Sequence, residues 1–469
     1  MRNIFTSLVL VAGLSLLFSS FNEAKAQATQ VDPQTAAALQ TRLDYLVSYY
    51  NLKGLSASVI IPGKGTWNGA SGISHAGVPI DTSMVFAIGS ITKSFTSAGI
   101  LLLQQDGLLS LSDSLHKFLP PYPNINPNIT LTQLLKHTSG IYNYFNHPSW
   151  INAVNMNPGL AMTPQFVLNN YVNAPVFAPG AMHEYSNTNY LLLGLVIQQV
   201  SGQSYASFIR QRLLNPLQLT SFYVSDHEPA MGVKPHNWTA PNPSSPGTDI
   251  STTPLTSIFG TSAADGALVG NAYDLARWGQ LLFTGQVLQN SSLQLMTQFM
   301  PINLGPTTGY GLGLMRTASG NAQAWGHSGG IRGFSASLMF SPADNIVVSL
   351  LCNKSSDPNT LAWSLLATAR QQLLTSAPGE VEGLRETIVC FPNPVKRNGT
   401  IQYTLRKAQQ VEITLQNSLC QTVKTLLSQP QQAGEQSLSV DTSTLPSGMY
   451  FCTLQTAENK LVQRWVITD

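Results

Sequence analysis

The hydrophobic pattern of the chain changes abruptly near residues 377–387, and this change most constrains how the chain can fold. Earlier residues mix helical and strand periodicity, whereas from about Ile388 onward the apolar residues alternate in five short segments, IQYTL, VEITLQ, SLSV, GMYFCTL and LVQRWVI. Strict alternation predicts half-buried β-strands. The chain has 469 residues, and a single hydrophobic core rarely grows beyond about 250–300 residues. We therefore predict two folded domains, residues 27–377 and a β-sandwich at 388–469, joined by a polar linker at 378–387.

The first 26 residues have the features of a secretory signal peptide. Arg2 precedes the apolar run IFTSLVLVAGLSLLFSS, and the segment ends in Ala24-Lys25-Ala26, a small-x-small cleavage pattern. A membrane anchor or a buried helix is the alternative, but the apolar run is shorter than the ~20 residues that a bilayer span needs. The sequence thus predicts export, with a mature chain that begins at Gln27 and has no transmembrane segment.

Charge and cysteine content exclude several classes of partner. Charged residues make up 10% of the chain, the net charge is +2, and no run of like charge occurs, so neither a nucleic acid nor an anionic lipid surface is an expected partner. Small molecules are expected instead. The four cysteines lack the spacing of a zinc site or a disulfide scaffold; we expect buried thiols, with one C-terminal disulfide as the alternative. No metal-binding or phosphate-loop motif is present, so we expect no metal and no cofactor.

The order of elements in the larger domain indicates an α/β (α+β) fold. A helical pattern at 37–50 precedes a hairpin, LSASVII and TWNGASG, and a second helical pattern runs from Ser90 to Gly107. Residues 110–300 have short helical patterns and loops rich in Pro and Asn, before the strands SASLMF and NIVVSLLC and a helix from Asp357-Pro358. This order predicts one antiparallel sheet built from both ends of the domain, flanked by helices, with a largely helical inserted region.

Ser90 and Lys93 are the first candidate catalytic pair. Their spacing places a hydroxyl and an amine on one face of a helix, within reach of each other. A serine hydroxyl becomes a nucleophile when a neighbouring base takes its proton, and a lysine can do so if burial keeps its amine neutral. Taken alone, however, S-x-x-K is also an ordinary helix N-terminus with a structural serine.

Two further motifs, Tyr185-Ser186-Asn187 and His327-Ser328-Gly329, follow in order along the chain. With Ser90 and Lys93 they make residues 30–377 resemble the penicillin-recognising serine hydrolases, which comprise class C β-lactamases, D-alanyl-D-alanine carboxypeptidases and related esterases. His-Ser-Gly stands where class C β-lactamases have Lys-Thr-Gly. This chain is therefore more similar to the carboxypeptidase and esterase branch.

The resemblance implies a role for each matching residue. Ser90 would attack a carbonyl, Lys93 and Tyr185 would share the proton transfer, and the backbone N–H groups of Ser90 and Gly330 would form the oxyanion hole. His327 would add positive charge near a substrate carboxylate and titrate near neutral pH. The implied substrate-binding set is Asn187, which would also orient Lys93, with His327, Ser328, Gly329 and Arg332.

The function so implied is that of a secreted serine hydrolase that forms an acyl-enzyme on amide or ester bonds, like a D-alanyl-D-alanine carboxypeptidase or a β-lactamase. The leading substrates are a peptide ending in D-alanine, a small ester or a β-lactam. A carboxylesterase of the same fold and a non-catalytic muropeptide- or surface-binding protein are the alternatives.

Two other residues could be mistaken for catalytic groups. Residues 326–330 satisfy G-x-S-x-G, which would make Ser328 the nucleophile of an α/β-hydrolase, but a nucleophile elbow needs a helix directly after the serine, and alternating strand residues follow here. His137, in the sequence KHTSG, is expected to be structural.

The last eighty residues resemble the C-terminal sorting domain of type IX secretion substrates. The resemblance is carried by Phe391-Pro392-Asn393-Pro394, by the strands IQYTL and VEITLQNSL, and by the turn LPSGMYFCTL. A carbohydrate-binding β-sandwich is the alternative, but it needs exposed aromatic residues, and Tyr403, Tyr450 and Trp465 occupy alternating positions typical of a core. With the signal peptide, the resemblance implies passage through the periplasm to the cell surface by the type IX machinery, with the module then removed or exchanged for an anchor.

Overall fold

The computed structural model describes residues 30–240, 245–261, 263–374, 386–417, 421–456 and 459–468. The predicted signal peptide, residues 1–26, and residues 378–385 of the predicted linker lie outside the described residues. The hydrophobic cores of the N-terminal part are made by residues between Val31 and Ala369, and a separate core is made by residues between Ile388 and Ile467. The two parts are described separately below.

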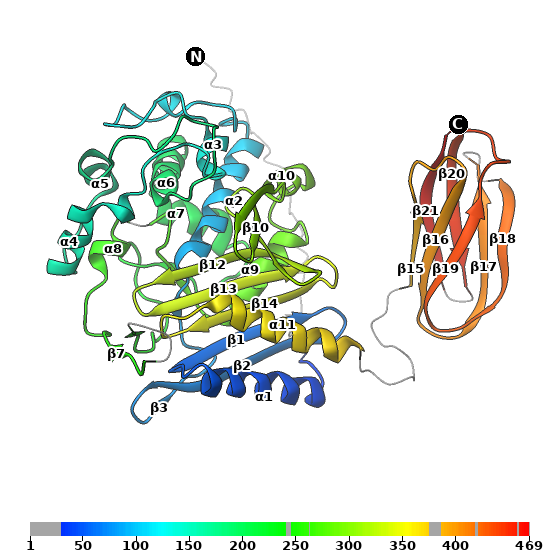
Figure 1. The fold of residues 1–469 in the computed structure, drawn as a ribbon, viewed down its shortest axis with the longest axis horizontal. Coiled ribbons are helices and arrows are strands. Elements are labelled where there is room, and N and C mark those ends of the chain that lie inside the picture. The colour runs from blue at the N-terminus through cyan, green and yellow to red at the C-terminus, as the bar shows by residue number, and fades with distance from the viewer. Residues whose placement is uncertain are drawn as a thin grey trace, which may run out of the picture.

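A nine-stranded antiparallel sheet forms the centre of the N-terminal part (Figure 1). Its central strands β1, β13 and β14 are buried along their whole length because helices cover both faces. Strands from the two ends of the domain meet where β1 pairs with β14, so that Ser58 lies opposite Ser349. In spatial order the strands are β3 (Val78–Pro79), β2 (Gly65–His75), β1 (Gly54–Ile61), β14 (Ile346–Cys352), β13 (Phe334–Ser341), β12 (Ala322–Ile331), β11 (Met315–Ser319), β10 (Thr307–Tyr310) and β9 (Met300–Leu304).

Helices pack on the two faces of this sheet. The first and last helices of the domain, α1 (Pro33–Tyr49) and α11 (Pro358–Leu374), share one core with residues of one face, including Met339. Helices α2 (Thr92–Gln105) and α9 (Ala272–Phe283) share the larger core with residues of the other face, including Leu338. The predicted antiparallel sheet flanked by helices is confirmed.

The region between the strands of the sheet is mainly helical, as predicted (Figure 1). It also contains short strands that the sequence did not reveal, because two or three residues are too few to show alternation. These are β4 (Phe86–Ala87), β5 (Tyr223–Val224) and β8 (Leu268–Gly270), which form a small sheet, and β6 (Trp238–Thr239) with β7 (Thr248–Asp249). Its other helical elements are η1 (Gly89–Ile91), η2 (Leu115–Lys117), α3 (Leu131–Leu135), η3 (Tyr144–Asn146), α4 (Pro148–Met156), α5 (Pro164–Asn170), α6 (Asn187–Ser201), α7 (Tyr205–Ile209), η4 (Arg210–Leu214), α8 (Thr256–Phe259) and α10 (Asn290–Met296).

The C-terminal part consists of two antiparallel sheets around the core of buried side chains that contains Trp465. The five predicted strands are present, and two more were missed. In β15, the exposed positions Val389 and Phe391 are apolar like the buried ones, so the sequence shows no alternation of polar and apolar residues. The pairing of β18 with β17 contains register shifts. One sheet contains β15 (Thr387–Phe391), β16 (Asn398–Leu405) and β19 (Gly434–Asp441), and the other β18 (Thr422–Gln431), β17 (Gln409–Gln416), β20 (Gly448–Gln455) and β21 (Lys460–Ile467).

The cysteines of the described residues are buried free thiols, as predicted: Cys352, Cys390 and Cys452. Cys420 lies outside the described residues. No helix among the described residues has the length and apolar character needed to cross a membrane.

Candidate active site

Ser90 lies in η1, directly before α2, where the backbone makes a close approach to the sheet. Gly89 has a φ of 52°, in the left-handed region that favours glycine. A Cβ on Gly89 would lie 2.8 Å from the backbone nitrogen of Gly330 in β12. The glycine therefore allows η1 to contact β12 and places the half-buried Ser90 next to that strand.

Lys93 lies one helical turn after Ser90, and its amine is fully buried. The Nζ atom is 3.1 Å from Ser90 Oγ, 2.8 Å from Asn187 Oδ1 and 2.6 Å from the backbone carbonyl oxygen of Asp265. The structure thus brings together Ser90, Lys93 and Asn187, which the sequence predicted as a group.

Burial lowers the pKa of Lys93 from its ordinary 10.5 to about 7. The carboxylate of Asp265 opposes this effect and raises the pKa of Lys93. Asp265 is itself buried, and its Oδ2 accepts a hydrogen bond of 3.1 Å from the hydroxyl of Tyr144. Reasoning from the sequence missed Asp265; the available signal was a single acidic residue in the otherwise small and apolar stretch Ala263–Gly270.

The partners of Lys93 decide where its lone pair points when the amine is neutral. The amide oxygen of Asn187 and the carbonyl oxygen of Asp265 can only accept hydrogen bonds, so they take the two N–H groups of a neutral amine. The lone pair then faces Ser90 Oγ, which can donate its proton to it. This arrangement suits a general base acting on the Ser90 hydroxyl.

Tyr185 lies against the same amine. Lys93 Nζ is 5.0 Å from the centroid of the Tyr185 ring. Burial raises the pKa of Tyr185 well above 10, and a hydrogen-bonding contribution from Ser90 only partly offsets the increase. Tyr185 is therefore a neutral phenol at neutral pH, able to donate a proton but not to act as a phenolate base.

The backbone of β12 lies beside Ser90 where the sequence predicted the oxyanion hole. A Cβ on Gly329 would be 1.9 Å from the carbonyl oxygen of Ile88 and 3.1 Å from the Ser90 nitrogen, so this position has no room for a side chain. The pairing of β11 with β12 ends at Met315 and Gly326. Beyond that pair, no strand of the described residues pairs with residues 327–331 of β12 on the β11 side.

His327 belongs to a buried chain of hydrogen bonds with His137 and Tyr310. The Ser186 N–H donates to His137 Nδ1 at 3.2 Å, so the proton of His137 is on Nε2, which donates to the Tyr310 hydroxyl at 3.1 Å. The Tyr310 hydroxyl in turn donates to His327 Nε2 at 3.1 Å, and His327 Nδ1 donates to the Ser328 carbonyl at 2.6 Å. Each group in this chain has one consistent donor and acceptor role, and the buried, hydrogen-bonded position of His137 agrees with the expected structural role.

The expectation that His327 carries positive charge and titrates near neutral pH is wrong. Burial and the nearby amine of Lys93 lower the pKa of His327 to about 3. The Tyr310 hydroxyl also uses the nitrogen that would have to gain the proton. His327 is therefore a neutral imidazole at neutral pH.

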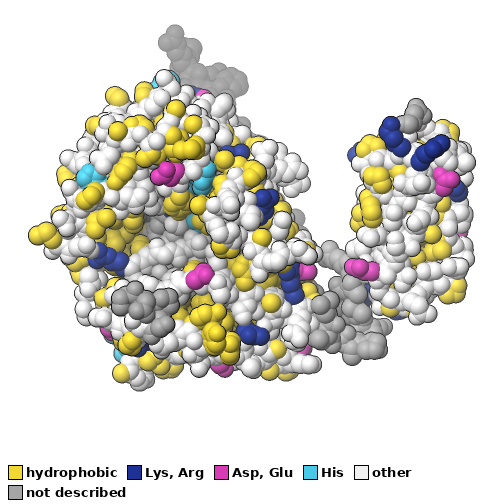
Figure 2. Space-filling view, viewed as in Figure 1, with side chains coloured by type: hydrophobic (Ala, Val, Ile, Leu, Met, Phe, Trp, Pro, Cys, Tyr) yellow, Lys and Arg dark blue, Asp and Glu magenta, His cyan; other side chains and the backbone are white. Residues whose placement is uncertain are grey.

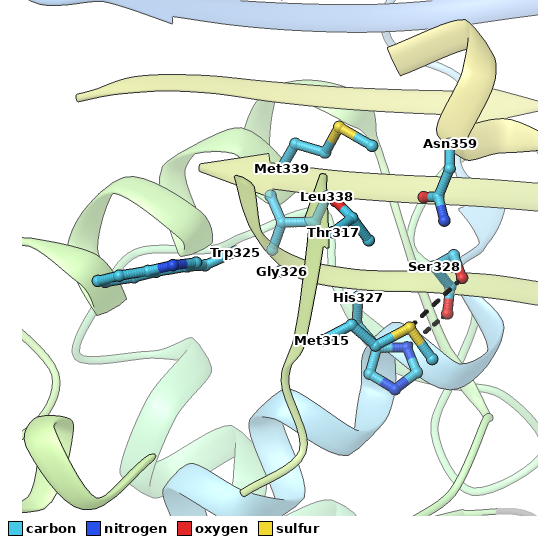
Figure 3. A pocket seen from close by; sticks show the side chains of 9 residues that line it. All are labelled: Met315, Thr317, Trp325, Gly326, His327, Ser328, Leu338, Met339 and Asn359. Atoms are coloured by element: carbon cyan, nitrogen blue, oxygen red, sulfur yellow. Dashed lines mark hydrogen bonds between the residues drawn. The ribbon is translucent and has the colours of Figure 1, made fainter. Parts of the chain in front are cut away.

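Ser328 follows His327 in β12, and both residues are part of the lining of one small cavity. Successive side chains of a strand point to opposite faces, and Ser328 lies opposite Ser337, whose hydroxyl donates to Asn359 of α11. Its own Oγ is 3.9 Å from Met315 Sδ, in a cavity of about 10 Å³ (Figure 3). That Ser328 and His327 bind one carboxylate stays a prediction. The chain after Ser328 continues as a strand, which agrees with its rejection as a nucleophile.

Arg332, the remaining candidate, lies at the end of β12. Its guanidinium donates a short hydrogen bond to Asn155 Oδ1 of α4, so it connects the sheet to the helical region. On the face drawn in Figure 2, charged side chains are few and scattered. The described residues contain no group of three or more His, Cys, Asp or Glu side chains placed to hold a metal ion.

Comparisons with known proteins agree with this geometry. A Beta-lactamase family model matches residues 36–370, and a model of the secretion-system C-terminal sorting domain matches residues 389–468. The chain is 27% identical to Penicillin-binding protein 4* of Bacillus subtilis, over 65% of this chain and 68% of that protein. It is 28% identical to Protein flp of Staphylococcus aureus, over 68% of this chain and 63% of that protein, which is slightly less than two thirds of the relative's length.

Among solved structures, a D-stereospecific amidohydrolase from Streptomyces sp. matches with 31% identity and a TM-score of 0.60, over 68% of this chain and 94% of that one. The C-terminal match indicates secretion or a cell-surface location through the type IX machinery. The chain belongs to the Beta-lactamase family of serine hydrolases and carries a C-terminal sorting domain.

Proposed function

We propose that this protein is a secreted serine amidase or esterase that forms an acyl-enzyme on Ser90. The observation that carries the proposal is the buried amine of Lys93, with a pKa of about 7, placed 3.1 Å from Ser90 Oγ. A base with a pKa near the working pH combines availability with the strength to take a proton.

The proposed reaction proceeds in two steps. In acylation, the Ser90 hydroxyl gives its proton to neutral Lys93, and Oγ forms a bond to the substrate carbonyl carbon. The N–H groups of Ser90 and Gly330 stabilise the oxyanion. The proton then passes from Lys93 through the Tyr185 phenol to the leaving amine or alcohol, whose bond to the carbonyl carbon breaks. In deacylation, water attacks the carbonyl carbon of the acyl-enzyme and gives a proton to Lys93. The bond from this carbon to Oγ then breaks and Lys93 returns the proton to Oγ, which leaves a carboxylic acid and free Ser90.

The proposed substrate has no free carboxylate at the position that His327 faces. A neutral imidazole gives no charge attraction there, so amides and esters suit the site better than peptides ending in D-alanine or β-lactams. The 31% identical relative is named as a D-stereospecific amidohydrolase, which supports amides of D-amino acids as the first substrates to test. D-alanyl-D-alanine carboxypeptidase activity and β-lactam hydrolysis are then slower reactions of the same site.

The first test is covalent labelling of the purified full-length protein. A fluorophosphonate probe should add its mass to the peptide that contains Ser90. Ser90→Ala should abolish labelling, and Lys93→Ala should slow it by about 10²–10⁴-fold, the usual contribution of a general base. Ser328→Ala is the matched control and should label like the wild type. A folded protein that takes no label would instead support a non-catalytic binding function.

The second test compares turnover of four substrates: a D-amino acid amide, a p-nitrophenyl ester, a D-Ala-D-Ala peptide and nitrocefin. We expect the amide and the ester to be hydrolysed faster than the two substrates that carry a carboxylate. Faster turnover of the peptide would contradict the proposed substrate class and favour a carboxypeptidase.

A further inference from the structure

A cavity of about 440 Å³ opens beside the predicted oxyanion strand. Gly330 is part of its lining, and the Gly330 nitrogen is the atom that a Cβ on Gly89 would approach to 2.8 Å. The cavity therefore begins close to η1, the element that carries Ser90. Its volume lies within the range of about 300–1,000 Å³ that is usual for small-molecule sites.

Most of the side chains lining the cavity are apolar, and they form two walls. One wall belongs to the helical region and the other to the turn from β12 to β13. The residues that matter most are Phe145, Trp150, Ile151 and Val154 on the first wall, and Ile331 and Phe334 on the second.

Both walls are fixed relative to the catalytic groups. Phe145 follows Tyr144, whose hydroxyl donates to the Asp265 carboxylate, and the Asp265 carbonyl holds Lys93. The second wall continues from Gly330. The hydrogen bond from Arg332 to Asn155 joins the two walls, so the cavity has a defined shape next to the nucleophile.

The charge of the lining also limits what the cavity can hold. Of the described residues that line it, only Arg332 is charged, and its guanidinium already donates to Asn155. The rings of Phe145 and Trp150 lie 4.5 Å apart between centroids, and such rings favour offset or edge-to-face contacts with a further aromatic ring. A methyl group would leave most of the cavity unfilled.

We propose that this cavity is the subsite for a large uncharged side chain of the substrate, and that the enzyme therefore prefers acyl groups with an aromatic side chain to alanyl groups. The proposal rests on the proposed function and specifies its substrate class. A well-formed apolar pocket discriminates between side chains of different size by tenfold or more.

The test compares kcat/KM of the full-length protein for the p-nitroanilides of D-phenylalanine and D-alanine, which share one leaving group. We expect a preference for phenylalanine of at least about tenfold. Ile151→Trp, at a position that is 42% exposed, should fill the cavity and remove this preference while turnover of the alanyl substrate is kept. Met156→Trp is the matched control, because Met156 is 84% exposed on the same helix and is not part of the lining.

A binding measurement separates this proposal from the proposed function. Calorimetry with Ser90→Ala protein should show D-phenylalaninamide binding at least about tenfold more tightly than D-alaninamide, and Ile151→Trp should abolish the difference. Equal affinities and equal kcat/KM values, or an equal loss of both activities in Ile151→Trp, would overturn the subsite. Absence of labelling at Ser90 would overturn the proposed function, and the affinity ratio would still decide the role of the cavity.

Discussion

At the scale of single residues, the site depends on one lysine that is buried without losing its hydrogen-bond partners. Burial favours the neutral amine, whereas the carboxylate of Asp265 favours the ammonium, and the two effects leave the pKa of Lys93 at about 7. A small change in either effect changes the fraction of active base at neutral pH. The pKa of Lys93 is therefore the most sensitive property of the site.

The first prediction concerns the dependence of acylation on pH. Because only the neutral amine accepts the Ser90 proton, the rate of acylation should rise with pH through about 7 and level off above it. Asp265→Asn removes the charge that raises the pKa of Lys93, so the rise should occur at lower pH. The measurement is the pH profile of single-turnover acylation, with Asp113→Asn as a distant control. A shift to higher pH in Asp265→Asn would contradict the role assigned to this carboxylate.

The second prediction concerns the buried hydrogen bonds of Tyr310. Tyr310→Phe leaves the Nε2 atoms of His137 and His327 without their partner, so we expect it to lower the free energy of unfolding by about 1–3 kcal/mol. Tyr223→Phe is the matched control, because the buried Tyr223 hydroxyl has no hydrogen-bond partner among the described residues. Denaturant unfolding measures both variants. Equal stability of the two would show that the chain of hydrogen bonds does not stabilise the fold.

At the scale of elements, the site is made where η1 meets β12. Neither element could form the oxyanion hole alone, because one predicted donor is on Ser90 and the other on Gly330. The contact requires glycine on both sides: Gly89 for its positive φ and Gly329 for lack of space. The distance between the two donors therefore depends on backbone packing rather than on any side chain.

The third prediction tests this contact. In Gly329→Ala, the new Cβ would meet the Ile88 carbonyl at 1.9 Å, so β12 must move away from η1. We expect acylation to slow by about 10²–10³-fold, the usual cost of losing one oxyanion donor. Gly159→Ala serves as control, because its Cβ would have no neighbour closer than 3.8 Å. Wild-type acylation by Gly329→Ala would mean that the contact is not needed.

At the scale of the whole molecule, the chain combines a hydrolase domain with a sorting domain, and each has its own core. Loss of stability in the sorting domain should therefore leave catalysis by the hydrolase domain unchanged. The core of the sorting domain contains Trp465, which is fully buried and donates from Nε1 to the Pro392 carbonyl.

The fourth prediction concerns this separation. Trp465→Ala should destabilise the C-terminal domain by about 3–5 kcal/mol, as is typical for removing a buried tryptophan, while labelling of Ser90 remains at the wild-type rate. Calorimetry of the full chain should show two unfolding transitions, of which only one moves. A single transition that moves as a whole would contradict independent folding.

Local patterns were enough to predict several features of this protein. The three-residue spacing of Ser90 and Lys93 placed them side by side, since residues three apart lie on the same side of either a 3₁₀ turn or an α-helix. Alternation and helical periodicity likewise gave the large antiparallel sheet, its covering helices and most strands of the C-terminal sandwich. The resemblance to the penicillin-recognising serine hydrolases added the predicted roles of Tyr185 and Asn187 and the predicted reaction.

Other features depended on contacts between distant parts of the chain. Asp265 contacts Lys93 although 172 residues separate them in the sequence. His327 is neutral because of burial and the nearby amine of Lys93. The apolar cavity is lined by residues of α4 and of the end of β12. None of these contacts leaves a periodic pattern in the sequence, because each joins single residues from distant parts of the chain. The sequence by itself determined which groups could react; the tertiary structure decided their protonation states and the space beside them, because both depend on burial.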